Sequence, residues 1–168
     1  LIAINLSPSI ISIWSEGQEL NILVSSEHSV GTHENSETGD TVNIGALLPL
    51  SGVRASSGKS TEAALESAVE DVNEYFSRTN SSIRFNIVVQ DTESDPTISL
   101  EKLKLLTENG IRIVIGPATS ANVEAIKDYA DKNDIIIMSH SSTAPSLAVA
   151  GDNLFRFVPN DLEQAKVI

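Results

Sequence analysis

The sequence contains no cysteine, so disulfide bonds, thiolate metal sites and cysteine nucleophiles are all excluded. Basic residues are scarce: 11 Lys and Arg stand against 23 Asp and Glu, and the net charge is -12. Such a chain is unsuited to nucleic acid or to an anionic membrane surface, because both need Lys and Arg in excess. What is present, 168 residues of which 40% are hydrophobic, suffices for one domain with a sizeable core.

Residues 1–40 differ in composition from the rest of the chain. Residues 1–14 are apolar but are interrupted by Ser and Pro, and they are fewer than the roughly 20 residues that span a bilayer. A polar tract without periodicity follows, which is typical of disorder. We expect a truncated export signal and a disordered linker here, with a stray apolar segment as the alternative to the signal. His28 and His33 lie in the tract, where a solvated linker is favoured over a metal site.

From Thr41 onward, strand and helix patterns alternate with short connections. Apolar residues at helical spacing predict the buried face of the first helix; they are Leu65, Ala68, Val69, Val72 and Phe76. The alternation predicts parallel strands joined by right-handed crossovers, with helices on both faces. The expected fold class is therefore α/β, a three-layer αβα sandwich in residues 41–168 with a parallel sheet of flavodoxin-like strand order.

In such sheets, ligands bind beyond the carboxyl ends of the strands. The loop expected after the third strand carries Thr119 and Ser120, and the loop after the fourth carries Ser141, Ser142 and Thr143. Each hydroxyl taken alone is favoured as a helix cap. Two neighbouring hydroxyl clusters, however, could hold one carboxylate between them, because each hydrogen bond to a charged group contributes roughly 1.5–3 kcal/mol.

Nucleotide and catalytic motifs are absent or incomplete. The loop expected at residues 49–60 ends in Gly-Lys-Ser, but its preceding glycine, Gly52, is one residue too early for a phosphate loop. Asp91, Glu93 and Asp95 resemble an acidic magnesium cluster, with strand termination and helix capping as the favoured alternative. No serine lies in a nucleophile elbow. We therefore predict no enzyme, no catalytic residue, no metal and no cofactor.

Five segments resemble the type I periplasmic binding proteins. They are VNIGALLPLSG, the helix pattern A-x-x-x-A-V-E-D-V-N, VVQDTESDP, VIGPATSA and IMSHSSTAPSLA. The combination of G-P-x-x-S with S-x-x-S-T-A-P-x-L is the most specific part. The branch that these segments resemble is that of the leucine/isoleucine/valine and general amino-acid binding proteins of ABC transporters, and related receptor ectodomains share the signatures.

The resemblance implies which residues bind ligand. Ser120 would hold the α-carboxylate, Thr143 would contact the carboxylate or the ammonium, and the carbonyl of Ser141 would face the ammonium. Ser57 takes the place of an aromatic residue that often packs on the ligand in the family. His140 stands where a proline is common, and we have no account of that change.

The resemblance also implies a two-lobed clamshell that closes by a hinge. The chain would supply the first lobe, incomplete and without its partner lobe. We expect an extracytoplasmic, secreted solute-binding protein, monomeric at full length, that passes an amino acid or similar small acid to an ABC permease. The alternatives are a sensor ectodomain of the same fold and a flavodoxin-like enzyme or regulatory domain that uses Asp91.

Overall fold

The computed structural model describes residues 3–7, 10–15, 18–23 and 41–166, with side chains described from Thr41 onward. The chain divides into two compact units, Leu1–Ser36 and Glu37–Ile168. In the first unit, strands β1 (Ala3–Ser7), β2 (Ile10–Ser15) and β3 (Gln18–Leu23) form an antiparallel sheet in that order. The export signal expected in this region stays a prediction. The expected linker, with both of its histidines, lies outside the described residues.

The second unit alternates strands and helices, as the sequence predicts. Its elements are β4 (Thr41–Leu48), the 3-10 turn η1 (Gly52–Arg54), α1 (Ala55–Arg78), β5 (Arg84–Asp91), α2 (Pro96–Glu108), β6 (Ile113–Ile115), α3 (Ser120–Lys132), β7 (Ile136–Ser139), the 3-10 turn η2 (Pro145–Leu147), β8 (Leu154–Arg156) and α4 (Asp161–Ala165). Among the described helices, none is long and apolar enough to cross a membrane.

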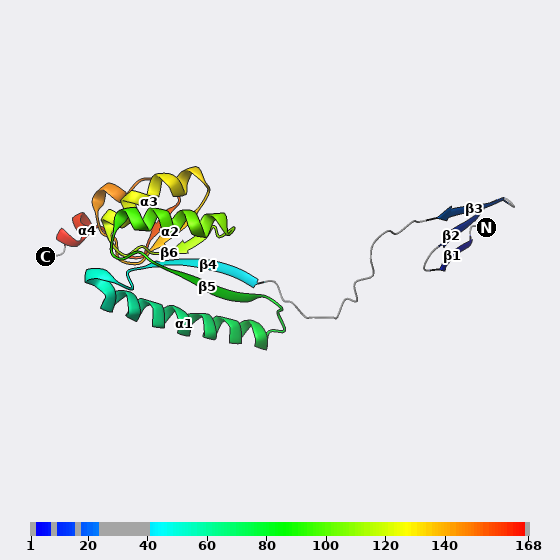
Figure 1. Ribbon diagram of the computed structural model, residues 1–168, viewed down its shortest axis with the longest axis horizontal. Helices are drawn as coiled ribbons and strands as arrows, with labels where there is room; N and C mark the ends of the chain where they lie inside the picture. The colour runs from blue at the N-terminus through cyan, green and yellow to red at the C-terminus, as the bar shows by residue number, and fades with distance from the viewer. Residues whose placement is uncertain (1–2, 8–9, 16–17, 24–40, 167–168) are drawn as a thin grey trace. The chain divides into compact units, whose positions relative to one another are not determined.

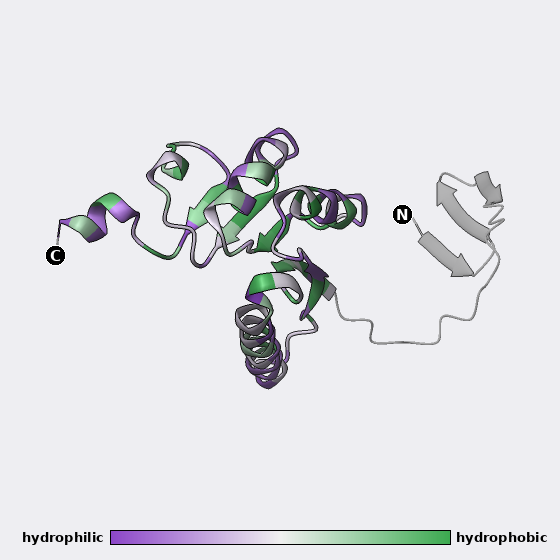
Figure 2. Ribbon diagram, turned by 60° about the vertical axis from the view of Figure 1, so that its left-hand side comes forward, coloured by the Kyte–Doolittle hydropathy of each residue, from purple (hydrophilic) through white to green (hydrophobic). Residues whose placement is uncertain are grey.

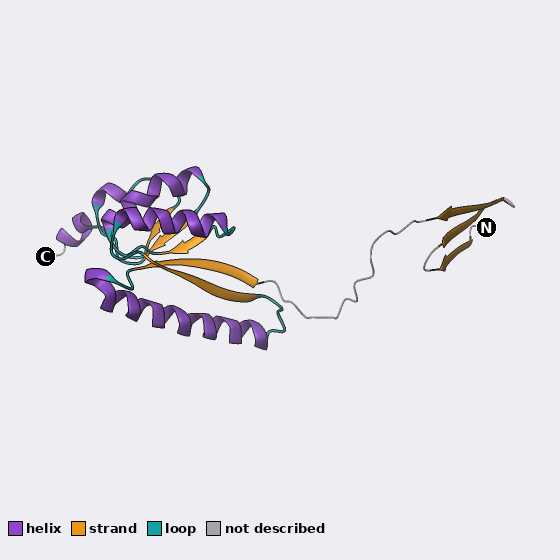
Figure 3. Ribbon diagram, in the orientation of Figure 1, coloured by secondary structure: helices purple, strands orange, loops and turns teal. Residues whose placement is uncertain are grey.

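The five strands of the second unit form one parallel sheet in the order β5-β4-β6-β7-β8. Numbered along this unit, the order is 2-1-3-4-5, which confirms the predicted flavodoxin-like arrangement. Figures 1 and 3 show α2 and α3 on one face of the sheet and α1 on the other. The direction of the crossovers therefore reverses between β4 and β6, where ligand sites of open α/β sheets form.

The hydrophobic core lies between the sheet and the α2–α3 layer. Its buried members are Leu47, Leu103, Leu106, Ile111, Val114, Ile126, Ala130, Ile135 and Ile137. In Figure 2 the strands are predominantly hydrophobic, and the outer surfaces of the helices carry the hydrophilic residues. Val123, Ile126 and Ala130 are all buried on α3, as their spacing predicts, and the last two belong to this core.

Helix α1 forms as predicted, but its expected buried face is only partly covered. Val72 remains 40% exposed, and Gly58 is the one buried residue of the helix. The helix packs mainly against β5, with a smaller contact to β4. Beyond it, on the same side of the sheet, Ile136 and Phe155 are also exposed. The periodicity identified the apolar face correctly; how much of that face is covered depends on neighbouring elements.

Helix α1 also begins earlier than the sequence predicts. The expected loop at residues 49–60 ends at Arg54, and the helix starts at Ala55 instead of Ser60. Gly58 lies in the first turns of this helix, where a Cβ atom would collide with the backbone of Pro49. Its glycine therefore allows the helix to approach the end of β4 closely, and the Gly-Lys-Ser triplet is helical.

Candidate functional site

The loops that follow β6 and β7 are joined by three side-chain hydrogen bonds. Ser139 Oγ donates to the carbonyl of Pro117 at 2.9 Å, and Ser141 Oγ donates to the carbonyl of Ala118 at 2.7 Å. The backbone N–H of Ala144 donates to Ser120 Oγ at 3.1 Å. The structure thus brings together the two hydroxyl clusters that lie 20 or more residues apart in the sequence.

Ser120 is the first residue of α3, and its hydroxyl keeps a free hydrogen-bonding function. A serine hydroxyl has one donor and two acceptor lone pairs. Ser120 uses an acceptor position for Ala144, and its donor has no partner among residues 41–166. Ser120 and Thr143 are both half-buried, and the Thr143 hydroxyl makes no hydrogen bond within the same residues. Both side chains can therefore present an O–H donor to a carboxylate.

Ser141 offers the opposite chemistry. Its side chain is exposed, but its O–H donor is committed to Ala118. What remains is the pair of lone pairs on Oγ, which can accept a hydrogen bond but cannot donate one. Such a group suits an ammonium, as does the backbone carbonyl that the family resemblance assigns to it.

Thr119 acts as a helix cap. It is the N-cap of α3, where its Oγ1 accepts from the N–H of Asn122 at 3.3 Å and donates to Asn122 Oδ1 at 2.9 Å. The Asn122 side chain is buried and donates in turn to Ser99 Oγ on α2 at 2.9 Å. Sequence reasoning missed Asn122, although the T-x-x-N spacing resembles a capping box.

Ser142 and Ser57, the remaining predicted contacts, differ from each other in exposure. Ser142 is 0% exposed, so its hydroxyl faces the protein interior, where no described residue bonds it. Ser57 is exposed within the first turn of α1, and no described hydrogen bond joins it to the loops after β6 and β7. We carry neither side chain into the proposed set of ligand contacts.

His140 lies directly between β7 and the hydroxyl cluster. It is half-buried, and this burial lowers the pKa of its imidazole, which favours the neutral form. Nδ1 is enclosed and lacks a hydrogen-bond partner among the described residues. A neutral ring at this position adds no positive charge to the loop.

Asp91 fastens the loops after β4 and β5 to each other. Its Oδ1 accepts from the backbone N–H groups of Leu50, Ser51 and Glu93 at 2.9, 3.2 and 2.8 Å. Burial opposes the charge of this carboxyl, but these bonds and the Ser51 side chain outweigh burial and lower its pKa. Asp95 caps α2 by accepting from the N–H groups of Thr97 and Ile98.

The described residues contain no group of three metal-ligating side chains. The favoured alternative for the acidic run, structural roles at a strand end and a helix start, fits the hydrogen bonds that Asp91 and Asp95 accept. Both carboxylates are occupied by backbone donors, as expected of groups that hold loops in place.

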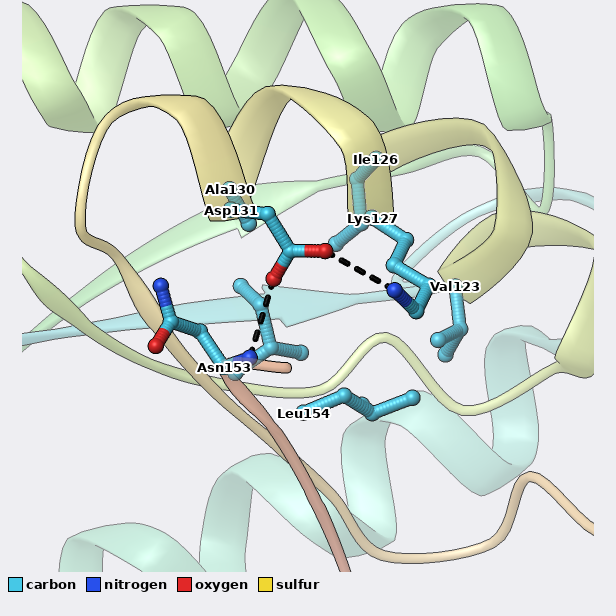
Figure 4. A pocket seen from close by; sticks show the side chains of 8 residues that line it. Val123, Ile126, Lys127, Ala130, Asp131, Asn153 and Leu154 are labelled. Atoms are coloured by element: carbon cyan, nitrogen blue, oxygen red, sulfur yellow. Dashed lines mark hydrogen bonds and ion pairs between the residues drawn. The ribbon is translucent and has the colours of Figure 1, made fainter. Parts of the chain in front are cut away.

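A narrow pocket lies elsewhere, between α3 and the β7–β8 region (Figure 4). Lys127 lies at its edge, within 2.8 Å of Asp131 and 3.2 Å of Asp152, and Asp131 also accepts from the N–H of Asn153. The hydrogen bond with Asp131, supported by Asp152, raises the pKa of Lys127. These bonds fasten the loop before β8 to α3, and the pocket is separate from the hydroxyl loops.

A family model described as "Periplasmic binding protein" matches residues 41–168. The chain belongs to the periplasmic binding protein family. This match confirms the resemblance inferred from the five sequence segments. The family consists of substrate-binding proteins and not of enzymes, so the prediction of a non-enzymatic protein is also confirmed.

The chain is similar to the following three proteins, among others. An uncharacterised protein of Methanocaldococcus jannaschii is 34% identical over 161 residues, which cover 88% of this chain and 39% of the relative. A chemotactic signal transduction system substrate-binding protein, BasB of Halobacterium salinarum, is 30% identical and is matched over 77% of this chain and 33% of its own length. The third relative is a solved structure of the branched-chain amino acid transporter substrate-binding protein LivJ from Streptococcus pneumoniae, in complex with isoleucine.

LivJ superposes with a TM-score of 0.66 at 26% identity, covering 73% of this chain and 35% of that protein. It confirms the α/β fold of a periplasmic binding protein lobe. The chain thus spans 33–39% of the length of these three relatives.

Proposed function

We propose that this periplasmic binding protein chain holds the α-amino and α-carboxyl groups of an amino acid, or a similar small carboxylate, at the loops after β6 and β7. The observation that carries the proposal is the hydrogen bond from the Ala144 N–H to Ser120 Oγ. It fixes the hydroxyl of Ser120 beside the loop that carries Thr143 and leaves its O–H free to donate. Ser141, with only acceptors left, serves the ammonium.

The proposed protein is an extracytoplasmic solute-binding protein that delivers its ligand to an ABC permease and acts as a monomer. Residues 41–168 form part of its first lobe, and residues 1–40 precede that lobe as an export signal and linker. The exposed apolar side chains of Ile136 and Phe155 support an incomplete lobe, because parallel sheets are usually covered on both faces.

Ligand binding can be tested by calorimetry on the full-length protein with L-isoleucine, L-leucine and other small carboxylates. Removing one hydrogen bond to a charged group costs roughly 1.5–3 kcal/mol. Ser120→Ala and Thr143→Ala should each weaken binding by about tenfold to a hundredfold. Thr79→Ala is the control, because it removes a hydroxyl at the far end of α1. Unchanged affinity in both site variants would leave these hydroxyls with structural roles only.

A second function, ligand sensing, has a specific observation in its favour. One relative, which is 30% identical to this chain, is named for chemotactic signal transduction. A sensor would use the same loops but a different partner. Capture of the ligand-loaded protein by a membrane-bound receptor, with no binding to a permease, would establish sensing in place of transport.

A further inference from the structure

Arg156, on β8, makes hydrogen bonds to the loop that carries the proposed ligand contact Thr143. Its Nη1 donates to the carbonyl of Ala144 at 2.9 Å and to that of Ser142 at 3.4 Å. The carbonyl between them, that of Thr143, accepts from the N–H of Asp161 at 3.0 Å. Three consecutive carbonyls of this loop are therefore held by the segment from Arg156, the last residue of β8, to Asp161, the first residue of α4.

Arg156 is half-buried, and no Asp or Glu within residues 41–166 forms an ion pair with it. A half-buried cation favours an anion in its vicinity, because charges away from bulk water are screened only weakly. The loop held by Arg156 is the one to which a ligand carboxylate would bind.

We propose that Arg156 is a positioning residue for carboxylate binding. By holding the carbonyls of Ser142 and Ala144, it fixes the loop in the conformation in which the Ala144 N–H meets Ser120 and Thr143 can donate to the ligand. Its positive charge, held at the loop by these bonds, adds to the affinity for an anionic group. The inference rests on the proposed function, and it assigns to that site a residue that does not itself contact the ligand.

Arg84 provides a matched control. It too is half-buried, donates through Nη1 to two backbone carbonyls, those of Ser81 and Ile83, and has no ion-pair partner among the described residues. It begins β5, however, and therefore lies at the amino-terminal edge of the sheet, opposite the candidate loops. Arg84→Met removes the same kind of bonds without touching the site.

The affinity test uses L-isoleucine and L-isoleucinamide as probes of the full-length protein. Arg156→Met should weaken binding of isoleucine by at least about tenfold, the equivalent of about 1.4 kcal/mol. The ratio of the affinities for isoleucine and its amide should shrink, and Arg156→Lys should restore part of the loss because it keeps the charge and a donor. Arg84→Met should leave both affinities unchanged.

Two results would overturn the inference: an equal loss in Arg84→Met, or an equal loss for acid and amide that Arg156→Lys does not relieve. Hydrogen exchange without ligand separates this inference from the proposed function. If the wild-type protein binds neither these probes nor any of the amino acids and small carboxylates tested by calorimetry, the proposed function fails. Exchange of the Ala144 amide then decides the positioning role alone: faster exchange in Arg156→Met but not in Arg84→Met supports it, and equal exchange refutes it.

Discussion

Replacing Asn122 by alanine tests whether the start of α3 is held in place by a buried polar network. Its side chain is 3% exposed and connects two helix starts. Oδ1 accepts from the Thr119 hydroxyl, and Nδ2 donates to Ser99 Oγ, which itself donates to the carbonyl of Asp95 at 2.8 Å. Because Ser120 follows Thr119 directly, loss of the network should also disturb the candidate site.

The magnitude follows from the bonds that the substitution removes. Two side-chain hydrogen bonds of 2.9 Å disappear, each contributing about 1 kcal/mol net. The space left by the amide in a packed interior adds to the loss, as in other large-to-small substitutions. We expect Asn122→Ala to lower the free energy of unfolding by about 2–3 kcal/mol in total.

Urea denaturation monitored by circular dichroism measures this loss. Asn109→Ala is the control, because its exposed side chain makes a single bond, to the carbonyl of Leu105 at 2.8 Å. It should cost about 0.5–1 kcal/mol. A double-mutant cycle with Ser99→Ala should give a coupling energy of about 1 kcal/mol. Equal losses in the two asparagine variants, together with no coupling to Ser99, would refute the network.

Three further predictions concern pH and packing. Because burial lowers the pKa of His140, the unfolded chain takes up that proton more readily, so stability should fall as pH drops below 6.5; His140→Gln should remove this part of a pH–stability curve. Burial would raise the pKa of Asp91, but its hydrogen bonds lower it, so the ionised carboxylate stabilises the fold fully above pH 3.8 and this stabilisation is lost as pH falls through the folded pKa. In Asp91→Asn, the urea midpoint should therefore depend less on pH below about pH 4. A Cβ atom at Gly58 would lie 2.5 Å from the Pro49 carbonyl carbon, so Gly58→Ala should lower the free energy of unfolding by about 2 kcal/mol despite the higher helix propensity of alanine, with Ser56→Ala as a neutral comparison.

The fold follows from short-range signals that the sequence displays. The alternation of apolar strands with helices of period 3.6 predicts the parallel sheet, and Asp95-Pro96 and Gly110 mark the two ends of α2. The start of α1 lacks such a signal. Its N-cap is Arg54, which makes no side-chain capping bond, so the sequence places the start five residues late, at Ser60.

The sequence predicts where the candidate site lies, but it does not predict which hydroxyls are accessible or which residues support the loops. Hydroxyls at the ends of neighbouring strands predict that Ser120 and Thr143 lie close together, because the carboxyl ends of parallel strands share one edge. Whether a hydroxyl faces solvent is decided by loop conformation, as the buried side chain of Ser142 shows. Arg156 acts on carbonyls 12 and 14 residues earlier in the chain, and no local pattern indicates such a bond.

The polar residues at the carboxyl edge of the sheet join the loops to one another, and some of them also have a hydrogen-bonding function left for a ligand. Asp91 joins the loops on one side of the β4–β6 reversal, and three serines join the loops on the other. Asp91 accepts these hydrogen bonds through one carboxylate oxygen. Ser120 accepts through a lone pair of its hydroxyl, whereas Ser141 donates its hydroxyl proton. A hydroxyl that both accepts and donates can fasten a loop with one function and offer the other to a ligand. An alanine could do neither, and a carboxylate would repel the proposed anion. This combination of needs is a physical reason for hydroxyl residues, rather than other polar ones, where the two loops meet.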